Sequence, residues 1–234
     1  MNMLMIVGVI VVGYLVGSFP TSVIAVRVLK GADIRDLGSG NAGATNTVRV
    51  LGARWGIIVG LVDLAKGWLA ITIARAAGMP DYVLVLSGLA AVAGHAFPLF
   101  ARFKGGKGVA TGAGMVLGLF PLAFLVCLGG FLGVLFLSGI VSISSITAAI
   151  LLPPSVYFLG GGKAAFETGD AVGIGIWLFS LALGIFVIVL HRKNIRRLIK
   201  GEERRFEKIS ILHRLNAARK RSASRDDQKD SSAD

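Results

Sequence analysis

Long apolar segments alternate with short polar stretches along most of the chain. Each apolar segment approaches or exceeds the roughly 20 residues that a helix needs to cross the hydrocarbon core of a bilayer. The pattern therefore predicts an all-α membrane protein, built as a compact polytopic bundle. The apolar segments are residues 3–26, 54–77, 82–101, 111–137, 139–160 and 170–190.

The segment 111–137 is too long to be one ordinary span. As a single helix it would measure about 40 Å, whereas the hydrocarbon core is roughly 30 Å thick. Gly118, Pro121 and the pair Gly129-Gly130 offer places to break it. A break near Pro121 gives seven transmembrane helices, some of them short or broken. The alternative is six spans, one of them long and tilted.

The positions of the basic residues distinguish between seven spans and six. Cytoplasmic loops are enriched in Lys and Arg, so an even number of crossings must separate any two basic clusters on that side. Seven spans satisfy this requirement, with the N-terminus outside and the C-terminus in the cytoplasm. The clusters are Arg27, Lys30, Arg35, Arg49 and Arg54, then Arg102, Lys104 and Lys107, then 14 Lys and Arg from Arg192 onward.

Composition and charge argue against a soluble protein and against a nucleic-acid-binding protein. The chain is 54% hydrophobic and 16% charged, whereas soluble domains carry about 25% charged residues. The net charge of +12 sits at the ends of apolar segments instead of forming one basic face, which argues against a nucleic-acid partner.

No basic residue precedes the first apolar segment and no A-x-A pattern follows it, so we interpret that segment as a retained span and not a signal peptide.

The predicted domain organisation is a transmembrane domain over residues 1–205 and a basic cytoplasmic tail over 206–234. Residues 191–216 mix basic and apolar side chains, which favours an amphipathic surface helix. Residues 217–234 are almost all small, charged or polar, a composition typical of disorder.

The first polar loop, residues 38–46, has the composition of a phosphate-binding loop. Glycines expose backbone N–H groups, Ser, Thr and Asn add neutral donors, and Arg adds charge. The alternative is a flexible linker in which the same polar residues act as helix caps. The candidate binding residues are Ser39, Gly40, Asn41, Thr45, Asn46 and Arg49.

The second polar loop combines glycine with lysine and lies on the same predicted cytoplasmic face. Its candidates are Lys104, Gly105, Gly106 and Lys107. The spacing and the missing Ser/Thr distinguish it from a G-x-x-x-x-G-K-S/T nucleotide loop. The alternative is a simple basic anchor at the membrane surface. Two such loops beside apolar segments indicate an integral membrane protein that handles a phosphorylated substrate.

Several further polar residues are candidates because they interrupt or end apolar segments. Asp63 and Lys66 are three apart on one helix face, where they form either a structural ion pair or a support for an anionic ligand. His95 serves either packing or substrate binding. The remaining candidates are Ser142 and Ser145 at the start of one segment and His191, Asn194, Arg197 and Glu203 after the last.

Four sequence blocks, taken together, resemble the bacterial acyl-phosphate-dependent glycerol-3-phosphate acyltransferases. They cover about residues 14–203, in order. The blocks are Gly17-Ser18-Phe19-Pro20 with Asp33-Ile34-Arg35 through Arg49, Asp63-Leu64-Ala65-Lys66-Gly67, Gly94-His95-Ala96-Phe97-Pro98 through Thr111, and His191, Asn194-Ile195, Arg197-Leu198, Gly201 and Glu203.

The resemblance implies a seven-helix enzyme of the bacterial inner membrane with its active site facing the cytoplasm. Such an enzyme moves a fatty acyl group from acyl phosphate to glycerol 3-phosphate, giving lysophosphatidic acid and phosphate, the first acylation of phospholipid synthesis. It implies no cofactor or metal. The expected partners are the two substrates and the lipid bilayer. The enzyme that supplies acyl phosphate is a candidate for contact as well.

We assign roles to the candidates as a hypothesis. Ser39, Gly40, Asn41 and Thr45, with the amides of Gly105 and Gly106, would hold the phosphate of acyl phosphate. Glycerol 3-phosphate would bind Arg49, Lys104 or Lys107, Ser142 or Ser145, and Asn194. The residues expected to be catalytic are His191, Asn194, Lys104 and Lys107.

The proton acceptor is either His191 or a phosphate oxygen of the substrate. The main alternative function is an organic-phosphate transporter or channel. A transporter usually has its site near the membrane midplane between repeated halves, and no repeat is visible in this chain. A basic adaptor that binds anionic lipid would not need the two loops.

Overall fold

The computed structural model describes residues 2–207 and 209–212, and every regular element in them is helical. The predicted all-α fold is therefore confirmed. The elements are α1 Met3–Gly17, α2 Thr21–Lys30, η1 Ile34–Asp36, α3 Ala44–Leu51, α4 Ala53–Ala76, α5 Asp81–Ala96, η2 Leu99–Ala101, α6 Val109–Leu119, α7 Pro121–Ser138, α8 Val141–Leu159, α9 Gly162–Thr168, α10 Ala171–Leu190 and α11 Arg192–Ile199.

Six stretches of the described chain are long and apolar enough to cross a membrane, and α6 is a shorter apolar helix. The six are Met3–Lys30, Ala53–Ala76, Asp81–Ala101, Pro121–Ser138, Val141–Leu159 and Ala171–Leu190. The predicted break near Pro121 is confirmed, because Phe120 separates α6 from α7 and Pro121 opens α7. Proline suits the first position of a helix, where its missing N–H has no partner to lose.

The first apolar segment differs from the single helix expected over 3–26. It breaks after Gly17, and α2 starts at Thr21. Pro20 has no N–H to give to a continuous helix, and the residue before a proline is biased away from helical conformation. The carbonyl of Phe19, freed by the break, accepts a hydrogen bond from Lys66 Nζ at 2.6 Å.

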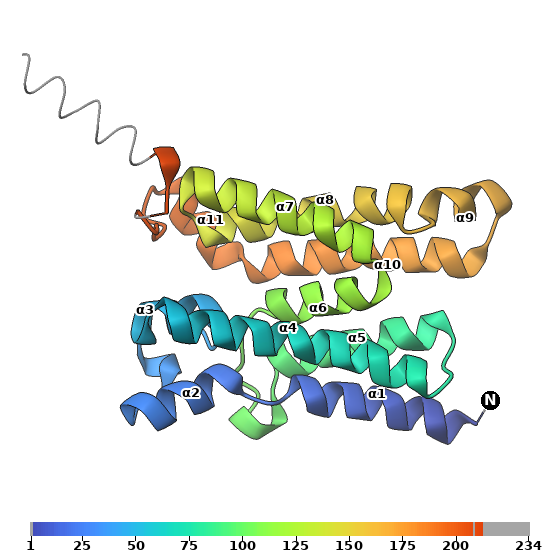
Figure 1. The fold of residues 1–234 in the computed structure, drawn as a ribbon, viewed down its shortest axis with the longest axis horizontal. Coiled ribbons are helices and arrows are strands. Elements are labelled where there is room, and N and C mark those ends of the chain that lie inside the picture. Colours follow the sequence, from blue (N-terminus) through green and yellow to red (C-terminus); the bar gives the residue numbers. More distant parts are fainter. Residues whose placement is uncertain (1, 208, 213–234) are drawn as a thin grey trace, which may run out of the picture.

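The helices form two halves with α6 between them (Figure 1). One half contains α1 to α5, and the other contains α7 to α11. Glycines permit a close approach of α4 and α6: a Cβ on Gly114 of α6 would lie 1.8 Å from the carbonyl oxygen of Leu64, and a Cβ on Gly67 of α4 would lie 1.9 Å from that of Thr111. The start of α1 lies at one end of the bundle, and α3 and α11 lie at the other (Figure 1).

The surface helix expected over 191–216 is shorter than predicted. α11 ends at Ile199, and Gly201 then adopts a positive φ of 71° that turns the chain. Residues 202–206 are not helical. The disorder expected over 217–234 concerns residues outside the described part of the chain.

Candidate active site

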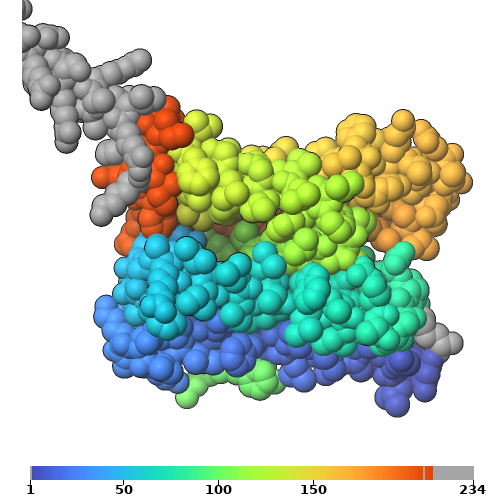
Figure 2. Space-filling view, viewed as in Figure 1, coloured from blue at the N-terminus to red at the C-terminus, as the bar shows by residue number. Residues whose placement is uncertain are grey.

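A cavity of about 650 Å³ lies between the two halves and is polar at one end and apolar at the other. Figure 2 shows it as a hollow between α7 and the pair α3 and α4. It brings together most of the residues that the sequence marked as candidates. The candidates that line it are Ser39, Gly40, Asn41, Thr45, Asn46, Arg49, His95, Gly106, Lys107, Ser142, Ser145, His191, Asn194, Arg197 and Glu203.

The first polar loop is held in shape by Asn46, which is fully buried. Its amide nitrogen donates to the carbonyls of Ile34 and Leu37, at 3.2 and 2.9 Å, and its side-chain oxygen accepts from the amide of Ser39 at 2.8 Å. The side chains of Asn41 and Thr45 line the cavity. Asn46 therefore organises the loop, and its neighbours present donors to the cavity.

The second polar loop brings one of its two lysines to the cavity. Lys107 lines it, whereas Lys104 is exposed outside it. The amides of Gly105 and Gly106 donate to the carbonyls of Ala96 and His95, both at 3.1 Å. These two amides, which we expected to hold a phosphate, instead fasten the loop to the end of α5.

Gly106 is required by close packing. A Cβ at this position would lie 2.2 Å from Nε2 of His95 and 2.5 Å from the carbonyl oxygen of Ala42. No real side chain tolerates such distances. The glycine thus lets the second loop pass between His95 and the first loop, which places Lys107 at the cavity.

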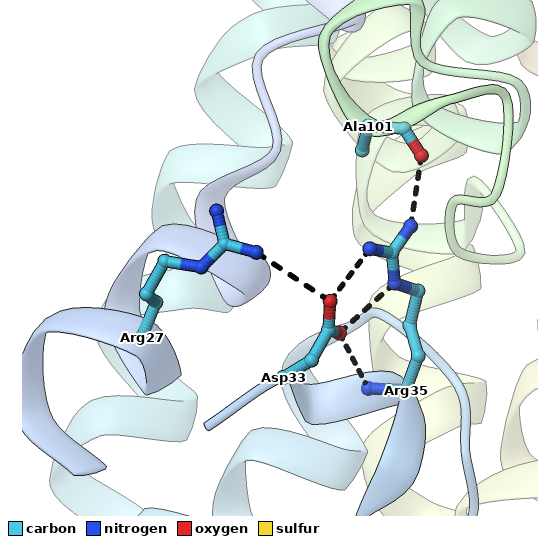
Figure 3. A network of polar contacts seen from close by, with 4 residues as sticks. All are labelled: Arg27, Asp33, Arg35 and Ala101. Carbon is cyan, nitrogen blue, oxygen red and sulfur yellow. Dashed lines mark hydrogen bonds and ion pairs between the residues drawn. The ribbon is translucent and has the colours of Figure 1, made fainter. Parts of the chain in front are cut away.

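A polar network outside the cavity supports this second loop (Figure 3). The Arg35 guanidinium binds both carboxylate oxygens of Asp33, at 2.9 and 2.6 Å, and donates to the carbonyl of Ala101 at 2.8 Å. Its hydrogen bond lowers the pKa of Asp33 to about 2. Directly after Ala101, Arg102 and Phe103 both have positive φ, which is strained for residues other than glycine. Arg35 therefore anchors the chain just before a strained turn.

Replacing Arg35 with alanine is expected to lower kcat/KM about tenfold, because a hydrogen bond to a charged group contributes about 1.5–3 kcal/mol and the loop carries Lys107. Arg27→Ala is the matched control. Arg27 also faces Asp33, at 3.8 Å, but its side chain is 68% exposed. Steady-state kinetics of both variants check this, and an equal loss in both would contradict it.

Glu203 is the centre of the polar end of the cavity. Its Oε1 accepts from Asn194 Nδ2 at 2.6 Å and from Ser142 Oγ at 2.9 Å, and its Oε2 accepts from Arg197 Nε at 2.6 Å. Asn194 also accepts a hydrogen bond from Lys107 Nζ. One carboxylate thus joins α8, α11 and the second loop.

Burial opposes ionisation of Glu203, yet the hydrogen bonds from Arg197, Asn194 and Ser142 outweigh it and lower its pKa. Burial lowers the pKa of Lys107 to about 8, and burial also lowers the pKa of Arg49. Among the described residues, five cations line the cavity together with two carboxylates, Asp63 and Glu203. The cations are Arg49, Lys107, Arg192, Lys193 and Arg197. This excess of positive charge around the cavity suits an anionic ligand.

His191 is oriented as a proton acceptor. Its Nδ1 lies 2.8 Å from the carbonyl oxygen of Val187, so Nδ1 carries the proton and Nε2 keeps its lone pair. Burial, followed by the nearby Lys107, lowers the pKa of His191 to about 4. The imidazole is therefore neutral near pH 7.

Two expected binding residues, Lys66 and His95, belong to a buried cluster around Asp63, part of which lines the cavity. Lys66 pairs with Asp63 at 2.6 Å, and Asp63 also accepts from Thr21 Oγ1 at 3.0 Å. Lys66 does not line the cavity, whereas Asp63 and His95 do. Nδ1 of His95 lies 3.7 Å from the same Asp63 oxygen. Lys66 thus binds the backbone at the break between α1 and α2. This is the structural role that was the alternative for the Asp63–Lys66 pair.

Ser142 and Ser145 are the two alternatives for a binding serine, and Ser142 is hydrogen-bonded to Glu203. Ser145 also lines the cavity, but its hydroxyl donates to the carbonyl of Val141 in its own helix, at 2.9 Å. Sequence reasoning missed the roles of Asp33 and Arg35, since the hydrogen bond from Arg35 to the carbonyl of Ala101 in another loop leaves no local signal. It also did not specify the apolar cavity wall, which includes Val116, Phe124, Leu128, Phe131, Leu152 and Leu183.

Comparison with known proteins identifies similar sequences and folds. Residues 7–201 match the family model described as glycerol-3-phosphate acyltransferase. A glycerol-3-phosphate acyltransferase of Chlorobium luteolum is 41% identical, over 87% of this chain and 97% of that protein. Two crystal structures of PlsY (YgiH), an integral membrane glycerol 3-phosphate acyltransferase, are 37% identical and cover 86% of this chain and 95% of theirs. The glycerol 3-phosphate form has a TM-score of 0.74 and the lysophosphatidic acid form 0.69.

Proposed function

Because the chain belongs to the glycerol-3-phosphate acyltransferase family, we propose that it transfers a fatty acyl group to glycerol 3-phosphate, with an acyl phosphate as the donor. The products are lysophosphatidic acid and inorganic phosphate. The observation that carries the proposal is one cavity with a cationic end, a neutral imidazole and an apolar wall. Such a cavity suits two phosphorylated molecules, one of which carries a fatty chain.

The two phosphates would occupy different parts of the polar end. The first loop and the start of α3 place Asn41 and Thr45 at the cavity, where they would meet the phosphate of the donor. Arg49, Lys107 and Arg197 offset the repulsion between the two anions as they meet. The Glu203 network holds Lys107 and Arg197 on the side that would receive glycerol 3-phosphate.

The acyl chain would lie along the apolar wall. Phe124, Leu128 and Phe131 of α7 line the cavity opposite Gly60 and Leu64 of α4. Figure 2 shows the hollow open at the side of the bundle between these helices. A fatty chain would enter from the bilayer by this opening while its phosphate stays at the polar end.

The reaction is a single acyl transfer. The hydroxyl oxygen of glycerol 3-phosphate attacks the donor carbonyl carbon, forming the ester bond, and the bond from that carbon to the phosphate oxygen breaks. Inorganic phosphate leaves with the bonding electrons. His191 Nε2 accepts the hydroxyl proton and can return it to the leaving phosphate.

We place the polar end on the cytoplasmic side of the bacterial inner membrane. Members of all three basic clusters, Arg49, Lys107 and Arg197, line the same cavity, which fits the enrichment of cytoplasmic loops in basic residues. Counting α6 as a short crossing gives seven spans. An odd number agrees with the start of α1 and α11 lying at opposite ends of the bundle (Figure 1).

The test is an assay of the purified protein in detergent with acyl phosphate and glycerol 3-phosphate. Lysophosphatidic acid and phosphate are expected in equal amounts. Acyl-CoA offered in place of acyl phosphate is expected to give no product. Intact acyl phosphate with no lysophosphatidic acid would overturn the proposal, and uptake of glycerol 3-phosphate into proteoliposomes without acylation would favour the transporter.

A further inference from the structure

The chain beyond the family match returns to the cavity after α11. The match ends at residue 201, where Gly201 turns the chain and the amide of Glu202 donates to the carbonyl of Arg197 at 2.8 Å. Residues 202–206, which we call the C-terminal return, follow. They bring Glu203 into the polar network and end at Phe206.

Phe206 is fixed to the turn between α7 and α8. Its amide donates to the carbonyl of Gly139 at 2.8 Å. Gly139 has a positive φ of 72°, and a Cβ there would lie 2.9 Å from the carbonyl oxygen of Phe206. Ser210 Oγ adds a hydrogen bond to the carbonyl of Leu137 at 3.1 Å. The backbone of the return is thereby seated on one half of the bundle.

The ring of Phe206 meets the other half. The guanidinium carbon of Arg49, on α3, lies 5.5 Å from the ring centroid, within the range of a cation–π contact. Arg49 forms no hydrogen bond or ion pair with any residue that the structure describes, and it lines the cavity. Within residues 2–207 and 209–212, the ring of Phe206 is thus the group that Arg49 contacts directly, while Glu203 acts on it only through its charge.

This kind of contact suits an arginine that must bind an anion. A carboxylate partner would occupy the N–H groups of the guanidinium and neutralise its charge. A ring contacts the face of the guanidinium and leaves its N–H edges available for bidentate binding of phosphate. Burial lowers the pKa of Arg49 most, and the charges of Arg204 and Arg197 lower it further while the Glu203 carboxylate raises it. A ring supports the guanidinium here without adding an anion that would compete with the phosphate.

We propose that Phe206 is a positioning residue that holds Arg49 ready for the phosphate of glycerol 3-phosphate, and that the C-terminal return links the two halves of the site. This inference rests on the proposed function for its choice of ligand. It adds a specificity element from a segment that the family match does not include. The ring acts on binding of the anion and leaves the proton transfer at His191 unchanged.

The experiment compares Phe206→Met, which keeps an apolar side chain, with Phe206→Tyr, which keeps the ring. Met is expected to raise the KM for glycerol 3-phosphate about 2- to 30-fold with little change in kcat, since a cation–π contact contributes about 0.5–2 kcal/mol. Tyr is expected to remain near wild type. Phe166→Met is the control, because Phe166 lies on α9 in a separate aromatic cluster.

Wild-type KM in Phe206→Met, or equal losses in the Met and Tyr variants, would overturn the inference, the second because it indicates a loss of packing. A thermal unfolding scan of each variant identifies a folding defect, and Phe206→Leu replaces Phe206→Met if the latter does not fold. Calorimetric titration with inorganic phosphate separates this inference from the proposed function. If wild type binds phosphate more tightly than Phe206→Met but makes no lysophosphatidic acid, only the proposed function fails.

Discussion

Replacing His191 with alanine is expected to lower kcat by at least about 100-fold, because a positioned general base contributes about 10²–10⁴-fold. The structure favours this role through the tautomer. Nδ1–H donates to the carbonyl of Val187, which leaves Nε2 as an acceptor in the cavity. The KM for glycerol 3-phosphate is expected to change much less than kcat. Single-turnover and steady-state rates with acyl phosphate provide the measurement.

The pH dependence of kcat gives a second readout of His191. The base must be neutral, and its pKa is lowered to about 4, chiefly by burial. Activity is therefore expected to persist down to about pH 5, where an ordinary histidine, with a pKa near 6.5, would already be protonated. Above about pH 8, Lys107 loses its charge, so the KM for the anionic substrates is expected to rise.

A loss of tenfold or less in His191→Ala would assign the proton to a phosphate oxygen of the substrate. His191→Gln serves as the matched control, since it retains a hydrogen-bonding side chain but no basic nitrogen. If Gln restores most of the rate lost in the alanine variant, His191 orients the substrate and does not accept its proton. An acid limb near pH 6.5 would contradict the buried environment of the imidazole.

Replacing Glu203 with glutamine is expected to lower kcat/KM by about 100-fold or more. Removing one member of a buried hydrogen-bonded charge pair costs about 2–5 kcal/mol, much of it from the charge left without a partner. The new amide group would also place a donor opposite either Arg197 Nε or Asn194 Nδ2, both of which need an acceptor. Lys107 would also be held less firmly at the cavity, because its hydrogen-bond partner Asn194 is itself fixed by Glu203.

Glu202→Gln is the control for Glu203. Glu202 is the adjacent residue, carries the same charge and is exposed, so its replacement is expected to leave kcat/KM within about twofold, as is usual for surface substitutions. Equal activity of the two variants would show that the Glu203 carboxylate does not organise the site. A lower unfolding temperature for Glu203→Gln alone is expected, because its partners join three separate segments.

Much of the helix arrangement follows from local properties of the chain. A membrane requires each crossing segment to satisfy its own backbone hydrogen bonds, so length and apolar composition reveal the crossings. The same reasoning placed the break near Pro121. It did not show the break before Thr21, because the few polar residues and Pro20 interrupt the apolar pattern only briefly before Val23 and Ile24 resume it. The Phe19 carbonyl at this break accepts from the nearby amide of Thr21 and from Lys66 Nζ on a distant helix, and no local pattern reveals the second contact.

By itself the sequence determined the all-helical membrane fold, the two polar loops and most of the polar residues that line the cavity, since residue type and spacing carry that information. Only the tertiary structure decided which of them point inward. Lys107 enters the cavity while Lys104 stays outside, because Gly106 must pass His95 and Arg35 holds Ala101. The tertiary structure also decided that the amides of Gly105 and Gly106 bind carbonyls at the end of α5, and that Lys66 binds the carbonyl of Phe19 at the break between α1 and α2. Those choices depend on contacts between residues far apart in the chain, which no local pattern records.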